Sequence, residues 1–429
     1  MRKIQQTLLP IKLEQSNDRL TSLAGLVLLE ELARAKRLWG RVDEVFPRAG
    51  SGRGHRASEF VRPLIWMMHA GGRHLEDVRE LRAEQEVLRR FGLERLPSAD
   101  ALGDWLRRMG AGPGVSALEQ LNRELMRSYL VAQAEEMTLD VDASIICAEK
   151  REAEWTYKKV KGYQPLLGYV EEVCVHHEFR AGNESAGAGA VRFLAGCLEQ
   201  LPAGKKIYLR SDSAYYQAAV INYCFEHELS FTITADQDSA VKAAIAGIKE
   251  CEWKEFKTSD GLATEREIAE TVHCMNETKQ AFRLLVLRWK NPQPSLFEAG
   301  GYCYHAIASS RQDNGSEIIW RHNQRGESEN WHKELKLGFG MEQLPCGQLQ
   351  ANAVFFSIGV LAYNLGLLLK AQLLPPEYRH VTVATLRWQL YRLAAKLIRH
   401  ARVWVLQLKT DGEKLALLLA VRKRCVELS

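Results

Sequence analysis

Residues 138–147 read TLDVDASIIC, and this stretch decides how the rest of the chain is interpreted. Its apolar and polar residues alternate and many are β-branched, which predicts a strand with one buried face. Side chains two positions apart on a strand point to the same face, so Asp140 and Asp142 are both expected to reach one site. The change in pattern at Met137 separates a helical head from a mixed α/β middle.

Upstream of this strand, residues 20–135 carry apolar side chains at helical spacing, which predicts a series of helices. Downstream, the same reasoning predicts strands and helices in alternation. The expected strands are 167–175, 206–211 and 230–234, and the expected helices are 186–201 and 215–228. Further strand-like runs without a long helix between them fill residues 250–310.

The last third of the chain returns to helical patterns. Residues 316–337 and the long apolar run 350–371 are predicted helices, and Pro375-Pro376 ends the second of them. Residues 385–425 are expected to be helical and basic. The middle of the chain thus has the element order strand-strand-strand-helix-strand-helix-strand, with a β stretch inserted before the last helix.

Composition places the chain among ordinary globular proteins, since 46% of its 429 residues are hydrophobic and 26% are charged. The greasy stretch 353–369 is interrupted by Ser, Asn and two Gly, so we expect a buried helix and no membrane partner. The nine cysteines stand singly, without a C-x-x-C pair, which fits reduced thiols in a cytosol and disfavours a zinc ribbon. The net charge of +5 is mild, but basic residues gather near the start and in the last forty residues, where they could contact phosphates.

Two more acidic positions are candidates for chemistry. Asp212 follows the predicted strand 206–211, and Glu329 lies on the predicted helix 316–337. At about 100° per residue, the helix places His322, Arg325, Glu329 and Lys336 within an arc of roughly 60°. A carboxylate beside cations suits phosphoryl transfer, but a solvated helix with an Arg325–Glu329 pair has the same spacing, so spacing alone leaves both interpretations open.

Arg325, Glu329 and Lys336 match in identity and spacing the C-terminal signature of a large group of bacterial insertion-sequence transposases: Tyr, two residues, Arg, three residues, Glu, six residues, Lys. His322 stands at the Tyr position, which is a departure from that signature. Three further segments resemble motifs of the same group in the same order: LDVDAS, KGYQPLL and LRSDSAYY, at residues 139–144, 161–167 and 209–216. Together they resemble the thirteen-eighty insertion-sequence family, a family of DDE-class transposases.

The resemblance implies an α/β fold with a ribonuclease-H-like catalytic core and a β-rich insertion, flanked by N- and C-terminal helical regions. The element order read from the residues agrees with it. The expected divisions are a helical DNA-end-binding region, the first part of the core, the β-rich insertion, the rest of the core with the Glu-bearing helix, and a basic helical tail, at residues 1–136, 137–235, 236–312, 313–372 and 373–429.

The resemblance also implies a site. Asp142, Asp212 and Glu329 would be the catalytic triad, and would bind Mg²⁺, for which Mn²⁺ can substitute, because bare carboxylates suit these hard cations. Asp140 is the second candidate for the first Asp; Asp142 is preferred because Ser144 follows it closely, as in the family. His322, Arg325 and Lys336 would contact DNA.

The expected function is cleavage of the element's ends and transfer of the freed strand into target DNA. The expected partners are double-stranded DNA, as terminal repeats and as target, and a second copy in a homodimer or larger paired-end complex. Two alternatives stay open at this point: a ribonuclease-H-like nuclease that cuts without joining, and a catalytically silent DNA-binding protein.

Overall fold

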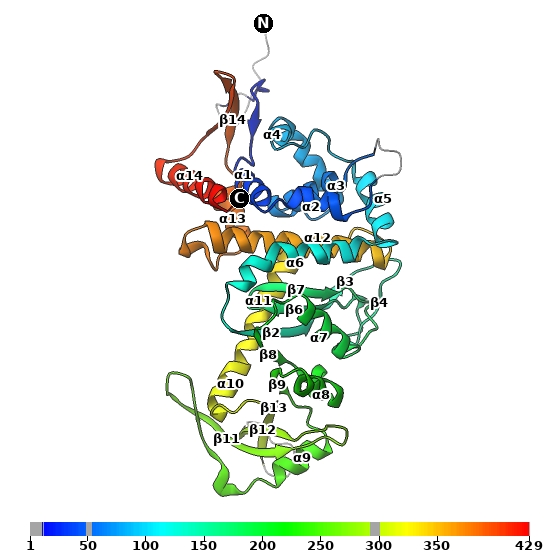
Figure 1. Cartoon of the computed structure of the whole chain (residues 1–429), viewed down its shortest axis with the longest axis vertical. Helices are drawn as coiled ribbons and strands as arrows, with labels where there is room; N and C mark the ends of the chain where they lie inside the picture. Colours follow the sequence, from blue (N-terminus) through cyan, green and yellow to red (C-terminus); the bar gives the residue numbers. More distant parts are fainter. Residues whose placement is uncertain (1–10, 12, 49–53, 292–300, 429) are drawn as a thin grey trace.

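The computed structural model describes residues 11, 13–48, 54–291 and 301–428. The molecule is elongated, with helices and a small sheet at one end, a mixed sheet in the middle and an antiparallel extension at the other end (Figure 1). Parts of the predicted regions 1–136, 236–312 and 373–429 lie outside the described residues, at 1–10, 12, 49–53, 292–300 and 429.

The centre is a nine-stranded sheet in the order β10-β11-β12-β13-β9-β8-β2-β6-β7. The five strands nearest the helical end are β2 (Glu136–Ala143), β6 (Leu166–Val170), β7 (Val173–Glu178), β8 (Lys206–Ser211) and β9 (Ser230–Thr234). β2, β8 and β9 run parallel, whereas β6 is antiparallel to β2 and β7 is antiparallel to β6. The first strand, β2, therefore lies in the middle of these five.

The predicted strands 206–211 and 230–234 are confirmed residue for residue, because both are short, mostly buried runs. The prediction of one strand over 167–175 is wrong: β6 and β7 are two strands joined by a tight turn at Glu171, whose φ is +53°. The turn contains neither Gly nor Asn, the usual signals for a positive φ, so no local pattern indicated it. This turn supplies the third strand of the predicted order.

The strand expected over 138–147 also divides. β2 ends at Ala143, and the chain continues into a separate three-stranded sheet in the order β3-β5-β4, made of β3 (Ile146–Cys147), β4 (Glu154–Trp155) and β5 (Lys161–Tyr163). Helices α7 (Ala190–Glu199) and α8 (Ala218–Glu226) connect β7 to β8 and β8 to β9. The path from β7 to β9 thus alternates strand and helix as the sequence predicted, whereas β3, β4 and β5 were not predicted as separate strands.

The far end of the sheet is formed by β10 (Lys254–Lys257), β11 (Ala263–His273), β12 (Phe282–Lys290) and β13 (Tyr302–Ser309), each antiparallel to its neighbour. β13 pairs antiparallel with β9, so the extension continues the central sheet. Helix α9 (Ser239–Ala246) precedes these strands, and its N-terminus is capped by Asp238, as a turn residue there should do.

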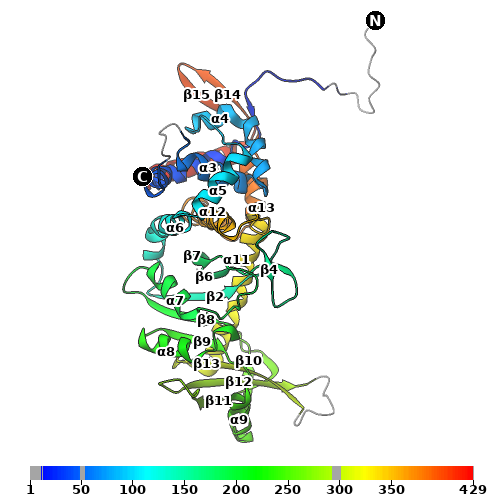
Figure 2. The same ribbon diagram turned by 90° about the vertical axis from the view of Figure 1, so that its right-hand side faces the viewer.

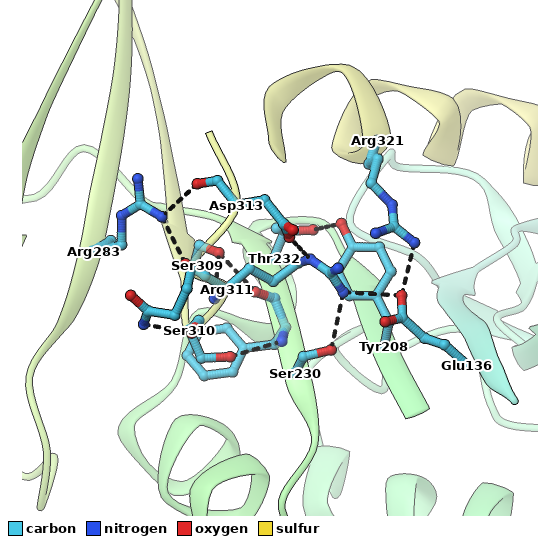
Figure 3. Close-up of polar contacts among 12 residues, drawn as sticks. Glu136, Tyr208, Ser230, Thr232, Arg283, Ser309, Ser310, Arg311, Asp313 and Arg321 are labelled. Atoms are coloured by element: carbon cyan, nitrogen blue, oxygen red, sulfur yellow. Dashed lines mark hydrogen bonds and ion pairs between the residues drawn. The ribbon is translucent and has the colours of Figure 1, made fainter. Parts of the chain in front are cut away.

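A polar network joins the extension to the core where β2 begins (Figure 3). The Arg311 Nη1 donates to the Glu136 Oε1 at 3.0 Å, and the Arg321 Nη2 donates to the same oxygen at 2.7 Å. Both guanidinium groups lie over the ring of Tyr208, whose hydroxyl is 2.7 Å from the Thr232 Oγ1. The network therefore ties the start of β2 to β8, β9 and the segment that follows β13.

The helical end contains α1 (Leu26–Ala35), α2 (Leu38–Val45), α3 (Ala57–Ala70), a 3-10 stretch over Leu75–Glu84, α4 (Gln85–Arg90), α5 (Ala99–Gly110) and α6 (Gly114–Val131). Helix α12 (Leu349–Leu368) lies between α1 to α5 and the sheet in both views, with α6 beside it (Figures 1 and 2). It packs on α3, α5, α6 and β7, and α6 also contacts β7.

Helix α12 and the π turn after it are long and apolar enough to cross a membrane by length and composition, but the apolar window is wholly buried in the protein. The expectation of a buried core helix is therefore confirmed. Asn364 is its main polar link: its Nδ2 donates to the Asn122 Oδ1 of α6 at 2.7 Å and to the Cys174 carbonyl of β7 at 2.8 Å. Its Oδ1 accepts from the Cys174 N–H, so this one buried amide links α12 to both α6 and β7.

The prediction that residues 385–425 are helical throughout is wrong. Helix α13 (Val383–Leu386), a π turn (Arg387–Tyr391) and α14 (Gly412–Glu427) are helical, but a hairpin of β14 (Ala395–His400) and β15 (Val403–Leu408) separates them. The two-residue turn at Ala401 and Arg402 has φ of +46° and +67°, again without Gly or Asn. β14 also pairs with β1 (Leu20–Thr21), a partner too distant in sequence for local patterns to reveal.

Candidate active site

The first two acidic positions lie on β2 and have different surroundings. Asp140 is buried, and its two carboxylate oxygens accept from the Arg210 Nε at 2.8 Å and the Arg210 Nη2 at 2.6 Å. Asp140 and Arg210 are partners in the parallel register of β2 and β8. Burial raises the pKa of Asp140, and the Arg210 guanidinium opposes that rise. Asp140 is therefore committed to an internal ion pair.

Asp142 lies two residues further along, where β2 approaches its end, and its side chain is 23% exposed. Its Oδ1 accepts from the Ala143 N–H, and its Oδ2 is 3.3 Å from the Arg325 Nη1. Burial, then the negative charges of Asp212 and Glu329, raise the pKa of Asp142 to about 6, although Arg325 acts in the opposite direction. The charges of Asp212 and Glu329 thus both act on Asp142, and Arg325 compensates for them only in part.

Asp212 comes directly after β8 and is half-buried. Val141 and Ser211 are partners in the register of β2 and β8, so Asp142 and Asp212 occupy the next positions on two adjacent parallel strands. Adjacent strands lie about 4.8 Å apart, which brings the two carboxylates to the same edge of the sheet. The Asp212 Oδ1 accepts from the Ala214 N–H and begins a 3-10 turn (Ser213–Tyr215), so this turn fixes the carboxylate in place.

Glu329 lies on α11 (Ser328–Lys333), which is one part of a helical segment of mixed geometry. Before it come α10 (Gly315–Asn323) and a 3-10 turn (Gln324–Glu327), and a π turn (Glu334–Gly338) follows. The predicted single face rested on uniform α-helical spacing, and 3-10 and π turns advance by different angles per residue. Glu329 is exposed, and its charge reaches Asp142.

Two other members of the predicted face, Arg325 and Lys336, contact the end of β2 and the segment that follows it. The Arg325 guanidinium meets Asp142, as described above, and the Lys336 Nζ donates to the Ile145 carbonyl at 2.7 Å. Lys336 therefore holds the segment that connects β2 to β3, three residues after Asp142. Sequence reasoning expected Lys336 to meet a phosphate and did not anticipate this backbone contact.

His322 does not join them. Its side chain is 3% exposed, with the Nδ1 2.9 Å from the Thr232 Oγ1 and the Nε2 3.0 Å from the Thr234 Oγ1. Burial lowers the pKa of His322 to about 3, so the ring is neutral at physiological pH. The structure thus places the predicted DNA contact inside the protein, where His322 fastens α10 to β9. Thr232 and Thr234 stand two apart on a predicted strand, so their hydroxyls face the same side. This was the available signal that a buried polar side chain such as His322 could bond to them.

Sequence reasoning also missed Arg210 and His332. Arg210 stood in the quoted motif LRSDSAYY, on a strand predicted to be buried. A charged side chain on such a strand needs a partner of opposite charge, and this was the available signal for its pair with Asp140. His332 is 7% exposed on α11, next to the ring of Tyr169, and within the described part of the chain neither of its ring nitrogens has a hydrogen-bond partner. No pattern in the sequence distinguished this histidine from a surface one.

The donor set fits a hard divalent cation in kind, since it consists of carboxylate oxygens. The neighbouring positions of Asp142 and Asp212 at the ends of two paired strands favour a cation, because added positive charge would relieve the repulsion that, after burial, raises the pKa of Asp142. The spacing is not that of a formed metal site: in the described ranges no three His, Cys, Asp or Glu side chains are grouped closely enough to hold a metal ion. The Arg325 guanidinium lies beside Asp142, where it partly neutralises that carboxylate.

No curated protein matches this sequence. A family model does, described as Transposase DDE domain group 1, and it matches residues 5–427, nearly the whole chain. The match to this family supports a transposase function and implies DNA as the substrate. Members of the family generally use divalent metal ions. The expectation of a DDE transposase is confirmed at this level, and the chain belongs to the family of transposase DDE domains of group 1.

Proposed function

We propose that this chain cleaves DNA at the ends of an insertion sequence and joins the freed 3′ ends to target DNA. Asp142, Asp212 and Glu329 are the proposed catalytic carboxylates. The observation that carries the proposal is the pairing of β2 with β8, which puts Asp142 and Asp212 on adjacent strands beside the charge of Glu329. Clustered carboxylates of this kind are how proteins hold metal ions for displacement at phosphorus.

A ribonuclease-H-like core is part of the proposal. Its support is the strand order β7-β6-β2-β8-β9, in which only β6 runs opposite to the other four. Its helices α7 and α8 connect the same strands as the predicted order required, and β10 to β13 stand between β9 and the Glu-bearing segment. The match of Arg325, Glu329 and Lys336 to the signature supports a closer assignment to the thirteen-eighty insertion-sequence family.

Divalent metal ions, Mg²⁺ or Mn²⁺, are the proposed cofactors, and Asp142, Asp212 and Glu329 would hold them. When bound, such ions polarise the phosphate and lower the pKa of an attacking water or 3′-OH. The residues of the chain do the positioning. The 3-10 turn fixes Asp212, Lys336 fixes the segment after Asp142, and Arg325 stands where its guanidinium can pass from Asp142 to a phosphate oxygen.

The proposed partners are double-stranded DNA, as element ends and as target, and a second copy of the chain, because two ends are cut together. The helical end of the molecule, predicted as residues 1–136, is the proposed reader of the terminal repeats. We assign Asp140 no role in catalysis, because both of its oxygens are already occupied by Arg210.

The deciding experiment measures metal-dependent cleavage of DNA that carries the element's own ends. The variants are Asp142→Asn, Asp212→Asn and Glu329→Gln, and the control is Glu327→Gln, an exposed carboxylate two positions before Glu329. Each of the three variants is expected to lower the cleavage rate at least about a thousand-fold, or roughly 4 kcal/mol in activation free energy. The control is expected to cut at the wild-type rate.

Products separate the alternatives. Joined strands support transposition, and nicks without joining support a nuclease. Binding of the ends without any cutting would support the catalytically silent alternative. Cleavage that survives Glu329→Gln would remove Glu329 from the proposed triad.

A further inference from the structure

The end of the molecule furthest from the extension carries a small sheet in the order β1-β14-β15, beside α4. Trp404 on β15 is its half-buried aromatic residue. Three arginines from different parts of the chain surround it: Arg19 before β1, Arg90 at the end of α4, and Arg399 on β14. We call Arg19, Arg90, Arg399 and Trp404 the arginine–tryptophan cluster.

The geometry of the cluster is specific. The guanidinium carbons of Arg90, Arg19 and Arg399 lie 4.0, 5.4 and 5.8 Å from the centroid of the Trp404 ring. Arg399 is the direct cross-strand partner of Trp404. A cation over the face of a tryptophan is attracted by the negative face of the ring, so Trp404 favours keeping the three guanidinium groups close to it in spite of their mutual repulsion.

Negative charge in the cluster is insufficient to balance these three cations. In the part of the chain that the structure describes, Arg19 alone of the three has a carboxylate within ion-pair distance, Glu86 at 3.8 Å. Glu86 is shared with Arg89, whose Nη1 is 2.9 Å away. The hairpin tip adds the exposed side chains of His400 and Arg402. All three arginines of the cluster are themselves exposed, so their charge faces solvent.

Exposed guanidinium groups gathered around one ring are suited to oxyanions, because each presents a planar fork of N–H donors that matches phosphate oxygens. Several such groups in one place suit a row of phosphates better than a single small anion. Both views place the hairpin of β14 and β15 at one end of the molecule, with α12 and the helices between it and β2 (Figures 1 and 2). A ligand that spans both places must be long.

We propose that the arginine–tryptophan cluster binds the phosphate backbone of duplex DNA, at a distance from the nucleotides that meet the carboxylates. The identity of the ligand rests on the proposed function, which supplies DNA as the substrate. Trp404 is a positioning residue in this arrangement, because its ring is occupied by the arginines and is not free to stack on a base. The contact is independent of sequence, since phosphates carry no base information.

The test measures binding of the full chain to an arbitrary duplex of about 40 bp, in EDTA, as a function of salt concentration. The test variant is Arg19→Gln, Arg90→Gln and Arg399→Gln combined. Its charge-matched control is Arg192→Gln, Lys257→Gln and Lys279→Gln combined, three exposed cations that pair with carboxylates outside the helical end. Thermal unfolding of both variants verifies that they are folded.

The slope of log K against log[salt] is expected to fall by about 0.9 for each phosphate that the protein no longer binds, and thus by about 2 to 3 in the test variant. Its affinity near physiological salt should drop by at least about ten-fold, whereas the control should stay within about two-fold of wild type. Trp404→Leu, which keeps all charges, is expected to weaken binding several-fold because the guanidinium groups lose their support.

Equal affinity and slope in the test variant and wild type would overturn the inference. So would loss of self-association, seen by sedimentation, with DNA binding per chain unchanged, since the cluster would then serve a second copy. Cleavage is measured separately: a wild-type chain that never cuts, but whose DNA binding depends on the cluster, would refute the proposed function and leave this inference standing.

Discussion

Asp140 and Asp142 stand two residues apart on one strand, and each has an arginine partner, yet the two pairs differ in kind. The Asp140–Arg210 pair is closed: its side chains are 1% and 6% exposed, and two hydrogen bonds join them. The Asp142–Arg325 pair is open: both side chains are 23% exposed, with a single contact of 3.3 Å. The first pair can only support the fold, and the second can exchange partners.

The difference comes from the positions of the two residues along β2 and not from their chemistry, which is the same. Asp140 faces Arg210 within the pairing between β2 and β8, one pair before its end, and both side chains are enclosed. Asp142 reaches the edge of the sheet, where water and two further carboxylates are close. The same residue type therefore serves structure at one position and is available for chemistry at the next one on that face.

The largest expected effect is a loss of stability when the buried Asp140–Arg210 pair is broken. Asp140→Ala leaves the buried Arg210 without its partner, which should lower the free energy of unfolding by about 3–5 kcal/mol. Urea unfolding followed by circular dichroism measures the loss. Asp140→Leu combined with Arg210→Met removes both charges and should recover most of it. A loss below about 1 kcal/mol in the single variant would mean that the closed pair does not hold the sheet together.

The second prediction is a gain in the free energy of unfolding when Asp142 is replaced. The pKa of Asp142 is about 6 in the folded chain, above its ordinary value, so the folded state binds an extra proton between about pH 4 and pH 6. Stability therefore falls as pH rises through that window, and the penalty is complete above it. Asp142→Asn removes the penalty and should stabilise the metal-free chain by about 2 kcal/mol at pH 7, and by little at pH 4.

Urea unfolding of wild type and Asp142→Asn in EDTA, repeated from pH 4 to pH 8, gives the two curves to be compared. Curves that stay parallel over this range would show that Asp142 is not strained by its neighbours. Mn²⁺ added at pH 7 should stabilise wild type more than the variant, because only wild type keeps all three carboxylates.

The smallest expected effect concerns the support of the open pair. Lys336→Met removes the hydrogen bond to the Ile145 carbonyl while keeping most of the side-chain length, and should cost about 1 kcal/mol of stability. Lys333→Met, at an exposed position of α11, is the matched control and should stay within about 0.5 kcal/mol of wild type. Thermal unfolding measures both, and equal values would leave Lys336 without a positioning role.

The sequence predicted the parts of the fold and site that depend on local burial. β8 and β9 were bounded correctly because their side chains are buried in uninterrupted runs, and Asp142 and Asp212 follow from where β2 and β8 end. It could not separate Asp140 from Asp142 by alternation, because both point to one face. Only the register against Arg210, a tertiary fact, shows that Asp140 is enclosed.

The remaining errors have the same origin. His322 departs from the predicted helical arc, since it is buried against β9 and a 3-10 turn interrupts the uniform α-helical spacing between His322 and Glu329. The hairpin at 395–408 was missed because its turn residues, Ala401 and Arg402, are not the usual ones and its partner β1 begins at residue 20. Local propensity cannot anticipate a pairing between the two ends of a chain.

The position of α12 bears on how the chain is made. Helices α3, α5 and α6 end 279, 239 and 218 residues before α12 begins, so during synthesis they are made with an apolar face that is still uncovered. That face is closed only when Leu349–Leu368 arrives. A chain that is truncated before α12 therefore exposes this apolar face and is prone to aggregation.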